Sequence, residues 1–166
     1  MIAPPLFTAE DFGRANDVWG ANCGPGAIAA IMGLTLDQVR PHMGDFERKG
    51  YTNPTLMLEA LRSIGRPWRL SSASWPRHGL VRIQWHGPWM KPAVPIGVRY
   101  RHSHWIAAAN DLRFGYGVFD INAMGNGSGW CRREDWEVIV APWIIKECVP
   151  RGDGGWSITH GIEVGA

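Results

Sequence analysis

Apolar positions divide the chain into a helical first part and a strand-like second part. Residues 24–31 are small or apolar on every side, which predicts a buried helix running from 23 or 24 to 31 or 32. Pro25 suits the first turn of such a helix, and Gly33 suits its end. A helix without a polar face is expected at the centre of the core.

The N-terminal segment is expected to be an irregular lead-in over about residues 1–15, containing one short helix. Thr8 and Asp11 have the spacing of a capping box, in which each side chain bonds the backbone N–H of the other residue. This pair predicts a helix over residues 8 to 15.

Two more helices follow the buried one. Thr35 is a good N-cap, and Pro41 limits the helix that begins there. Asn53 and Pro54 give the clearest start signal in the chain, and Gly65 ends the helix that they begin.

Beyond residue 66, short apolar runs alternate with Gly, Pro and polar turns, a pattern typical of strands. The expected strands are 80–85, 94–100, 104–109 and 116–121, with a hairpin connection over 110–115 and an interrupted strand over 136–145. Helices first and a mostly antiparallel sheet second predict an α+β fold in one domain over residues 1–166. The Gly-rich segment 151–166 is expected to be a partly mobile tail.

Composition narrows the function classes. Apolar residues make up 45% of the chain and charged residues 19%, which is typical of a globular protein, and the net charge of +2 does not favour nucleic-acid binding. We see no signal peptide and no membrane-length apolar run, so the default expectation is a cytoplasmic protein with no membrane partner. The three cysteines lack C-x-x-C spacing, which argues against a disulfide framework.

Ten tryptophans are an unusual number for 166 residues. They predict either a core built from large aromatic rings or a groove lined by some of them. The pattern does not separate the two.

Cys23 is the candidate nucleophile because it stands at the N-terminus of the buried helix, where the helix dipole favours the thiolate. His104 begins an apolar strand and is the candidate base. Asp120 ends the next strand and is the candidate group that orients the imidazole. Taken singly, each has an ordinary structural explanation; together they supply the parts of a Cys-His-Asp triad.

The motifs Asn22-Cys23-Gly24-Pro25, Ser103-His104-Trp105 and Phe119-Asp120 resemble those of the papain-like cysteine peptidases, in particular the bacteriocin-processing branch. The resemblance covers about residues 16–145. It implies a central nucleophile helix packed on the sheet and hydrolysis of a peptide, isopeptide or amide bond in a protein or peptide substrate. It implies no cofactor and no metal.

One position departs from this family, which places a Gln six residues before the nucleophile to stabilise the oxyanion. Here that position is Asp17, a carboxylate that would repel an oxyanion. Asn16 and Asn22 are the two side chains that could replace the Gln.

Three alternatives stay open. The same triad could transfer an acyl group to an amine or deamidate a substrate. The fold could also be an inactive protein-binding module. In addition, His102 and His104 lie on one face of a strand and could hold zinc with Cys23 or Cys131. The oligomeric state is not predicted.

Overall fold

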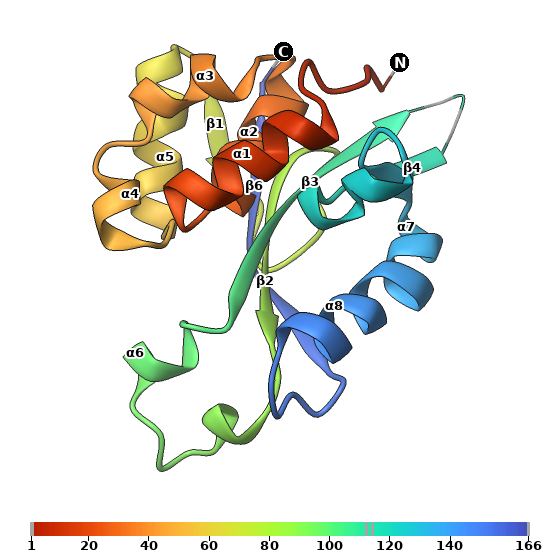
Figure 1. Cartoon of the computed structure of the whole chain (residues 1–166). Coiled ribbons are helices and arrows are strands. Elements are labelled where there is room, and N and C mark those ends of the chain that lie inside the picture. Colours follow the sequence, from red (N-terminus) through yellow and green to blue (C-terminus); the bar gives the residue numbers. More distant parts are fainter. Residues whose placement is uncertain (1, 112, 114, 166) are drawn as a thin grey trace.

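A six-stranded antiparallel sheet with the strand order β1-β6-β2-β3-β4-β5 runs through the molecule (Figure 1). This computed structural model describes residues 2–111, 113 and 115–165. The strands are β1 (Trp68–Leu70), β2 (His78–Trp85), β3 (Ser103–Asp111), β4 (Gly115–Phe119), β5 (Trp130–Arg132) and β6 (Trp156–Val164). The α+β class and the antiparallel sheet expected from the sequence are confirmed.

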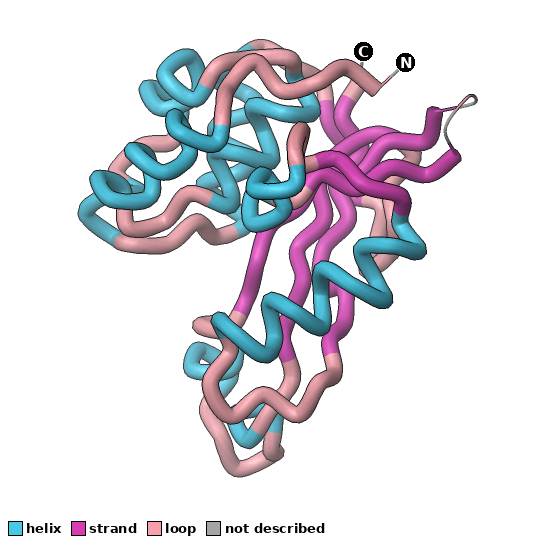
Figure 2. Tube along the Cα trace, turned by 45° about the vertical axis from the view of Figure 1, so that its right-hand side comes forward, coloured by secondary structure: helices cyan, strands magenta, loops and turns pink. Residues whose placement is uncertain are grey.

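Helices cover the two faces of the sheet unequally, as Figures 1 and 2 show. The N-terminal helices gather on one face: α1 (Ala9–Trp19), α2 (Cys23–Met32), α3 (Leu36–Val39), η1 (Arg40–His42), α4 (Phe46–Lys49) and α5 (Pro54–Ile64). The other face carries α7 (Arg133–Asp135), η4 (Trp136–Val140) and α8 (Ala141–Cys148). Three short helical segments lie in connections: η2 (Pro88–Met90), α6 (Ile96–Arg99) and η3 (Ile121–Asn126).

Each face of the sheet has its own hydrophobic core. Ile28 of α2 packs with Trp105 of β3 in the core under the N-terminal helices. Ile83 of β2 packs with Trp136 of η4 in the core on the opposite face. β2 and β3 therefore contribute to both cores through alternate residues, as strands covered on both faces do.

The predicted starts and stops of the helices between residues 23 and 65 are confirmed. All residues from 24 to 31 are buried in α2, and Gly33 ends this helix in the left-handed conformation. Asn53 caps α5 by accepting the backbone N–H of Leu56 (2.9 Å). Thr35 caps α3 as expected.

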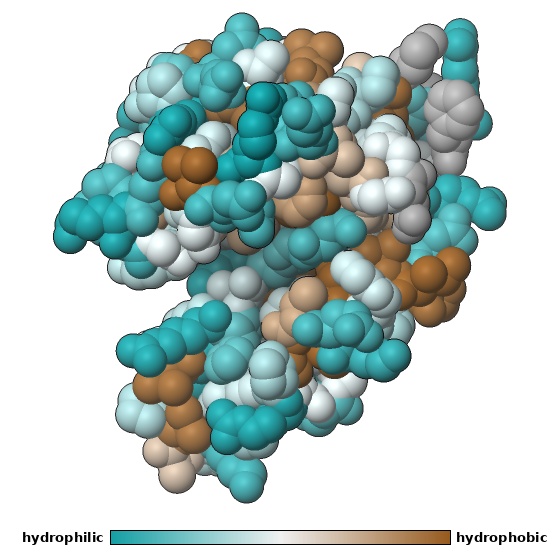
Figure 3. Space-filling view, viewed as in Figure 1, coloured by the Kyte–Doolittle hydropathy of each residue, from teal (hydrophilic) through white to brown (hydrophobic). Residues whose placement is uncertain are grey.

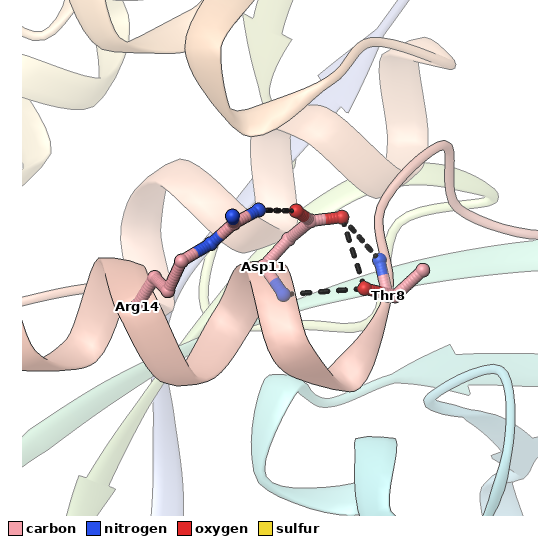
Figure 4. A network of polar contacts seen from close by, with 3 residues as sticks. All are labelled: Thr8, Asp11 and Arg14. Atoms are coloured by element: carbon pink, nitrogen blue, oxygen red, sulfur yellow. Dashed lines mark hydrogen bonds and ion pairs between the residues drawn. The ribbon is translucent and has the colours of Figure 1, made fainter.

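The capping box at Thr8 forms, and the helix behind it is longer than predicted (Figure 4). The Thr8 N–H donates to the Asp11 carboxylate (2.9 Å), and the Asp11 N–H donates to the Thr8 hydroxyl (3.2 Å). Arg14 pairs with the same carboxylate. Because α1 continues to Trp19, much of the expected irregular lead-in is helical.

Two predicted strands are wrong. The segment 94–100 contains the helical turn α6, which begins directly after Pro95. The segment 136–145 is helical because its buried residues, Trp136, Ala141 and Ile144, recur at helical spacing, whereas Val138 and Ile139 are exposed.

The segment 151–166, expected to be a partly mobile tail, contains a strand. Residues 156–164 form β6, which lies between β1 and β2 inside the sheet. Gly161 permits this packing, since a Cβ atom there would lie 2.1 Å from the Ser74 carbonyl oxygen. Gly161 therefore marks a close approach of β6 to the connection between β1 and β2. The short strands β1 and β5 and the turn α4 were not predicted from the sequence.

No helix in the described part of the chain has the length and apolarity needed to cross a membrane. Cys23, Cys131 and Cys148 are free thiols.

Replacing Thr8 by Ala should lower the free energy of unfolding by about 1 kcal/mol, because the Asp11 N–H loses its acceptor. Urea denaturation followed by circular dichroism measures this loss. Thr8→Ser keeps the hydroxyl and should retain most of the stability. Equal losses in both variants would show that the capping bond contributes nothing.

Candidate active site

A cavity of about 830 Å³ lies where the N-terminal helices meet the lower part of the sheet. Figure 3 shows it as a cleft between the upper and lower parts of the molecule. Cys23 and His104 both line it, together with residues from the α4–α5 connection and from α6. The cleft gives a ligand access to both side chains.

Cys23 is the first residue of α2, and the glycines after it let this helix start approach its neighbours closely. A Cβ atom at Gly24 would lie 2.5 Å from Oγ1 of Thr52 and 2.9 Å from Sδ of Met57. A Cβ atom at Gly26 would lie 2.5 Å from Cδ1 of Ile121. The two glycines therefore fix the position of the Cys23 thiol relative to η3 and to Thr52, the residue before Asn53.

The imidazole of His104 is fixed by a buried carboxylate. Nε2 of His104 lies 2.9 Å from Oδ1 of Asp120, and both side chains are buried. Since Nε2 is occupied, Nδ1 is the nitrogen left for the thiol of Cys23. β3 and β4 pair directly, with Ala107 opposite Phe119, which brings His104 and Asp120 to the same end of the hairpin.

Asp120 has two further donors besides His104. Nε1 of Trp136 donates to Oδ2 (2.8 Å), and the backbone N–H of Asn122 donates to Oδ1 (3.0 Å). A fully buried carboxylate is costly unless its lone pairs are satisfied, and these three donors satisfy it. The carboxylate is thus held in one orientation toward the imidazole.

Tryptophan rings enclose this pair on the side away from the cleft. Trp85 stacks on His104 with 6.0 Å between ring centroids and a 24° interplanar angle. Trp136 stacks on Trp85 at 6.4 Å. These rings keep water from the His104–Asp120 bond, which strengthens the bond electrostatically.

Charges within the site lower the pKa of the Cys23 thiol and raise that of the His104 imidazole, and both shifts favour an ion pair between the two. Burial raises the pKa of the Cys23 thiol, but a hydrogen bond and the positive charge from His104, with the N–H of Trp105, bring the net pKa below the ordinary value. Burial lowers the pKa of His104, but Asp120 and Cys23 outweigh this and raise it to about 10. Both shifts favour a Cys23 thiolate beside a His104 imidazolium over the neutral pair.

Asp120 stays ionised in this arrangement. Burial raises the pKa of its carboxyl group, while the charge and hydrogen bond of His104 and the N–H groups of Trp136 and Asn122 lower it below the ordinary value. The negative charge therefore persists next to the imidazolium.

The other thiols have different surroundings. Cys131 is partly buried, and its thiol faces the carbonyl oxygen of Val118 at 3.7 Å. Burial, with the charges of Asp120 and Asp135, raises the pKa of Cys131 to about 11, so it is protonated at neutral pH. Cys148 is exposed.

The zinc alternative gains no support. The His102 ring stacks on Trp89 with 3.7 Å between centroids, whereas the His104 ring binds Asp120. Within residues 2–111, 113 and 115–165, no three His, Cys, Asp or Glu side chains are grouped so that they could hold a metal ion.

The two predicted oxyanion donors differ in position. Asn22 lines the cavity, and its Nδ2 donates to Oδ1 of Asn16 (3.2 Å). Asn16 and Asp17 are exposed on α1, away from the cavity lining. In the first turn of α2, Pro25 has no N–H and that of Gly26 donates to the Asn22 carbonyl (2.9 Å), which leaves the N–H groups of Cys23 and Gly24 for a ligand.

The structure thus brings Asn22, Cys23 and His104 together in the lining of the cleft and bonds buried Asp120 to His104. The sequence interpretation missed the positioning partners of this group. Trp136 and Trp85 are two of the ten tryptophans, and composition alone does not indicate which of them lie at the site. Thr52 gave no signal, although its carbonyl oxygen accepts Nε1 of Trp105 (3.0 Å) and ties the helices to β3.

Comparison of the sequence with models of known protein families, and with curated proteins, finds no match.

Replacing Trp136 by Phe keeps an aromatic ring but removes a donor from buried Asp120. The free energy of unfolding should fall by about 1.5–3 kcal/mol, the range for hydrogen bonds to charged groups. Urea denaturation measures the change. Trp143→Phe, at an exposed position of α8, is the matched control and should change stability by less than about 0.5 kcal/mol. Similar effects in both variants would contradict a special role for the Trp136 N–H.

Proposed function

We propose that the protein is a papain-like thiol hydrolase that cleaves a peptide, isopeptide or amide bond. The observation that carries this proposal is the His104 imidazole, bonded to buried Asp120 on one side and facing Cys23 at a helix N-terminus on the other. Asp120 bonds His104, and His104 and Cys23 shift each other's pKa, which is the coupling that covalent catalysis requires.

In the first half of the reaction, the thiolate of Cys23 attacks the substrate carbonyl carbon and forms a C–S bond. His104 gives its proton to the leaving nitrogen as the C–N bond breaks. The product amine leaves, and the acyl group stays on Cys23 as a thioester.

In the second half, neutral His104 takes a proton from a water molecule, whose oxygen attacks the thioester. The C–S bond breaks, the acid is released, and the thiolate–imidazolium pair is restored. Asp120 keeps the imidazole oriented throughout. An amine in place of water would give acyl transfer instead, and a side-chain amide as substrate would give deamidation.

Asn22 is the better candidate for the oxyanion-stabilising side chain. It lines the cavity beside Cys23, whereas Asn16 does not. One N–H of the Asn22 amide is held by Asn16, which leaves its second N–H for the oxyanion. The backbone N–H of Cys23 is the second donor. Asn16 would then act as a positioning residue.

A binding module without catalysis remains the rival from another class. Burying the Asp120 carboxylate costs desolvation free energy. A protein that only binds a partner has no need for such a carboxylate to hold the His104 imidazole beside the Cys23 thiol. The triad geometry therefore favours the enzyme.

Alkylation by iodoacetamide tests the thiolate directly. An ordinary thiol has a pKa of about 8.5 and loses about tenfold in rate for each pH unit below it. Because the pKa of Cys23 is lowered, its alkylation rate should fall less steeply from pH 8 to pH 6 than that of free cysteine in the same buffer. Mass spectrometry of the labelled peptides gives the rate at each cysteine.

His104→Ala removes the positive charge and should restore an ordinary pH dependence at Cys23. Cys131, with its pKa raised to about 11, should react slowest in both proteins. If Cys23 follows the same pH dependence as free cysteine in the unaltered protein, the activated thiolate is disproved.

Acylation separates oxyanion stabilisation from thiolate formation. p-Nitrophenyl acetate acylates a thiolate through a tetrahedral oxyanion, whereas iodoacetamide reacts by direct displacement. Asn22→Ala should slow the p-nitrophenol burst by about 10²-fold and leave alkylation of Cys23 nearly unchanged. Asn16→Ala, the matched control, should have the smaller effect of a positioning residue. Parallel losses of acylation and alkylation would instead mean that Asn22 supports the thiolate.

A further inference from the structure

A buried arginine without a carboxylate partner forms part of the cleft. Arg82 belongs to β2, lines the same cavity as Cys23, and is only 5% exposed. Its Nη2 donates to Oγ of Ser103 (3.0 Å) and to the carbonyl oxygen of Tyr100 (3.4 Å). Its Cζ lies 5.1 Å from the centre of the Tyr100 ring. All these partners are neutral.

The rest of the guanidinium is unpaired. Nε of Arg82 is buried with no hydrogen-bond acceptor. Across residues 2–111, 113 and 115–165, none of the ion pairs includes Arg82. Nη1 has no hydrogen-bond partner among these residues either and is left for a ligand in the cavity. A buried cation without a counter-charge costs stability, so its position calls for a functional explanation.

The cavity around Arg82 is suited to an anion. Arg101 is a second arginine of the lining, and none of the described lining residues is Asp or Glu. Burial lowers the pKa of Arg82, and the nearby Tyr100 and Cys23 oppose this, so Arg82 and the nucleophile are within electrostatic range of each other. An anionic group bound at Arg82 would therefore lie close to the bond that Cys23 attacks.

We propose that Arg82 is a specificity residue that binds a carboxylate group of the substrate next to the scissile bond. The proposal rests on the proposed function and adds to it the chemical class of substrate. A guanidinium presents N–H donors in a planar fork that matches a carboxylate, and peptides supply carboxylates in two ways. One is the side chain of Asp or Glu near the scissile bond; the other is a free C-terminal carboxyl group.

Iodoacetate and iodoacetamide form a matched pair of probes for this inference. Both alkylate a thiolate with loss of iodide, and they differ by one carboxylate in place of an amide. The ratio of their rate constants at Cys23, divided by the same ratio at exposed Cys148, measures how strongly the cleft attracts a carboxylate. The imidazolium of His104 contributes to this attraction, so variants of Arg82 are needed to isolate its share.

Arg82→Met should lower the normalised ratio on the order of tenfold, because the bound carboxylate loses a charged donor. Arg82→Lys keeps the charge and should retain most of the preference. Arg101→Met is the matched control for the general charge of the cleft and should change the ratio by less than about threefold, since Arg101 is exposed and screened by solvent. If Arg82→Met leaves the ratio unchanged, the carboxylate site is disproved.

Three N-acetylated tripeptides distinguish the two sources of carboxylate. One has a central glutamate and an amidated end, the second a central glutamine and a free C-terminal carboxyl group, and the third a central glutamine and an amidated end. Protection of Cys23 from iodoacetamide by the first indicates a side-chain carboxylate, and protection by the second indicates a C-terminal carboxylate. Equal protection by all three would overturn the proposal.

The urea midpoint separates a ligand-binding role of Arg82 from a structural role. The two roles predict opposite changes in the midpoint when the guanidinium is removed. Removing an unpaired buried cation should leave the urea midpoint unchanged or raise it, so Arg82→Met is expected to be at least as stable as the unaltered protein. A clear fall in the midpoint would mean that Arg82 is needed for folding, contrary to the proposal. The peptide-protection measurements use the unaltered protein and stay decisive if the variant does not fold.

This design separates failure of the inference from failure of the proposed function. If Cys23 shows no enhanced reactivity toward iodoacetamide, the thiol hydrolase itself is wrong. If Cys23 is reactive but neither the iodoacetate ratio nor peptide protection depends on a carboxylate, only the role of Arg82 is wrong.

Discussion

The burial of one carboxylate organises the site. Asp120 lies with no exposed surface between the two cores, and its charge must be met by donors from within the protein. Those donors come from three places along the chain: the ring of His104 on β3, the indole of Trp136 on η4 and the backbone of Asn122 on η3. The need to satisfy one carboxylate thus ties both faces of the sheet to the position of the imidazole.

The nucleophile is positioned by a different constraint, the absence of side chains. Gly24 and Gly26 bring the start of α2 against Thr52 and Ile121 at distances that no Cβ atom would allow. Ile121 directly follows Asp120, so the helix that carries Cys23 packs against the segment that carries the carboxylate. Close packing on one side and a buried charge on the other together set the geometry of thiol and imidazole.

Local signals in the sequence predicted much of this arrangement. Helix ends were predicted well because capping residues and glycines act within a few residues, as Thr8, Asn53 and Gly33 illustrate. The proximity of Cys23, His104 and Asp120 was also expected, from motifs that each lie at the end of an element. The errors arose where tertiary contacts decide the outcome.

Two segments illustrate those errors. Residues 136–145 are rich in Val, Ile and Trp and favour a strand locally, but burial of Trp136 and Ile144 against the sheet selects a helix. β6 was missed because the glycines in and around it suggested a loop, whereas Gly161 lets the strand pass close to residues 71–74 in the β1–β2 connection. Arg82 could not be recognised either, since one arginine in an apolar strand gives no indication of whether a carboxylate lies opposite it.

The place of β6 in the sheet also has a consequence for how the molecule assembles. Its neighbours β1 and β2 precede it by a long stretch of chain, so their facing edges stay open while the intervening helices and strands emerge during synthesis. Open strand edges invite pairing with other chains, and contacts between distant segments slow folding. Assembly of the sheet is thus completed only when β6 pairs with β2 and gives β1 its hydrogen-bonding partner, which makes the pairing of β6, rather than helix formation, the expected slow step on the way to a working cleft.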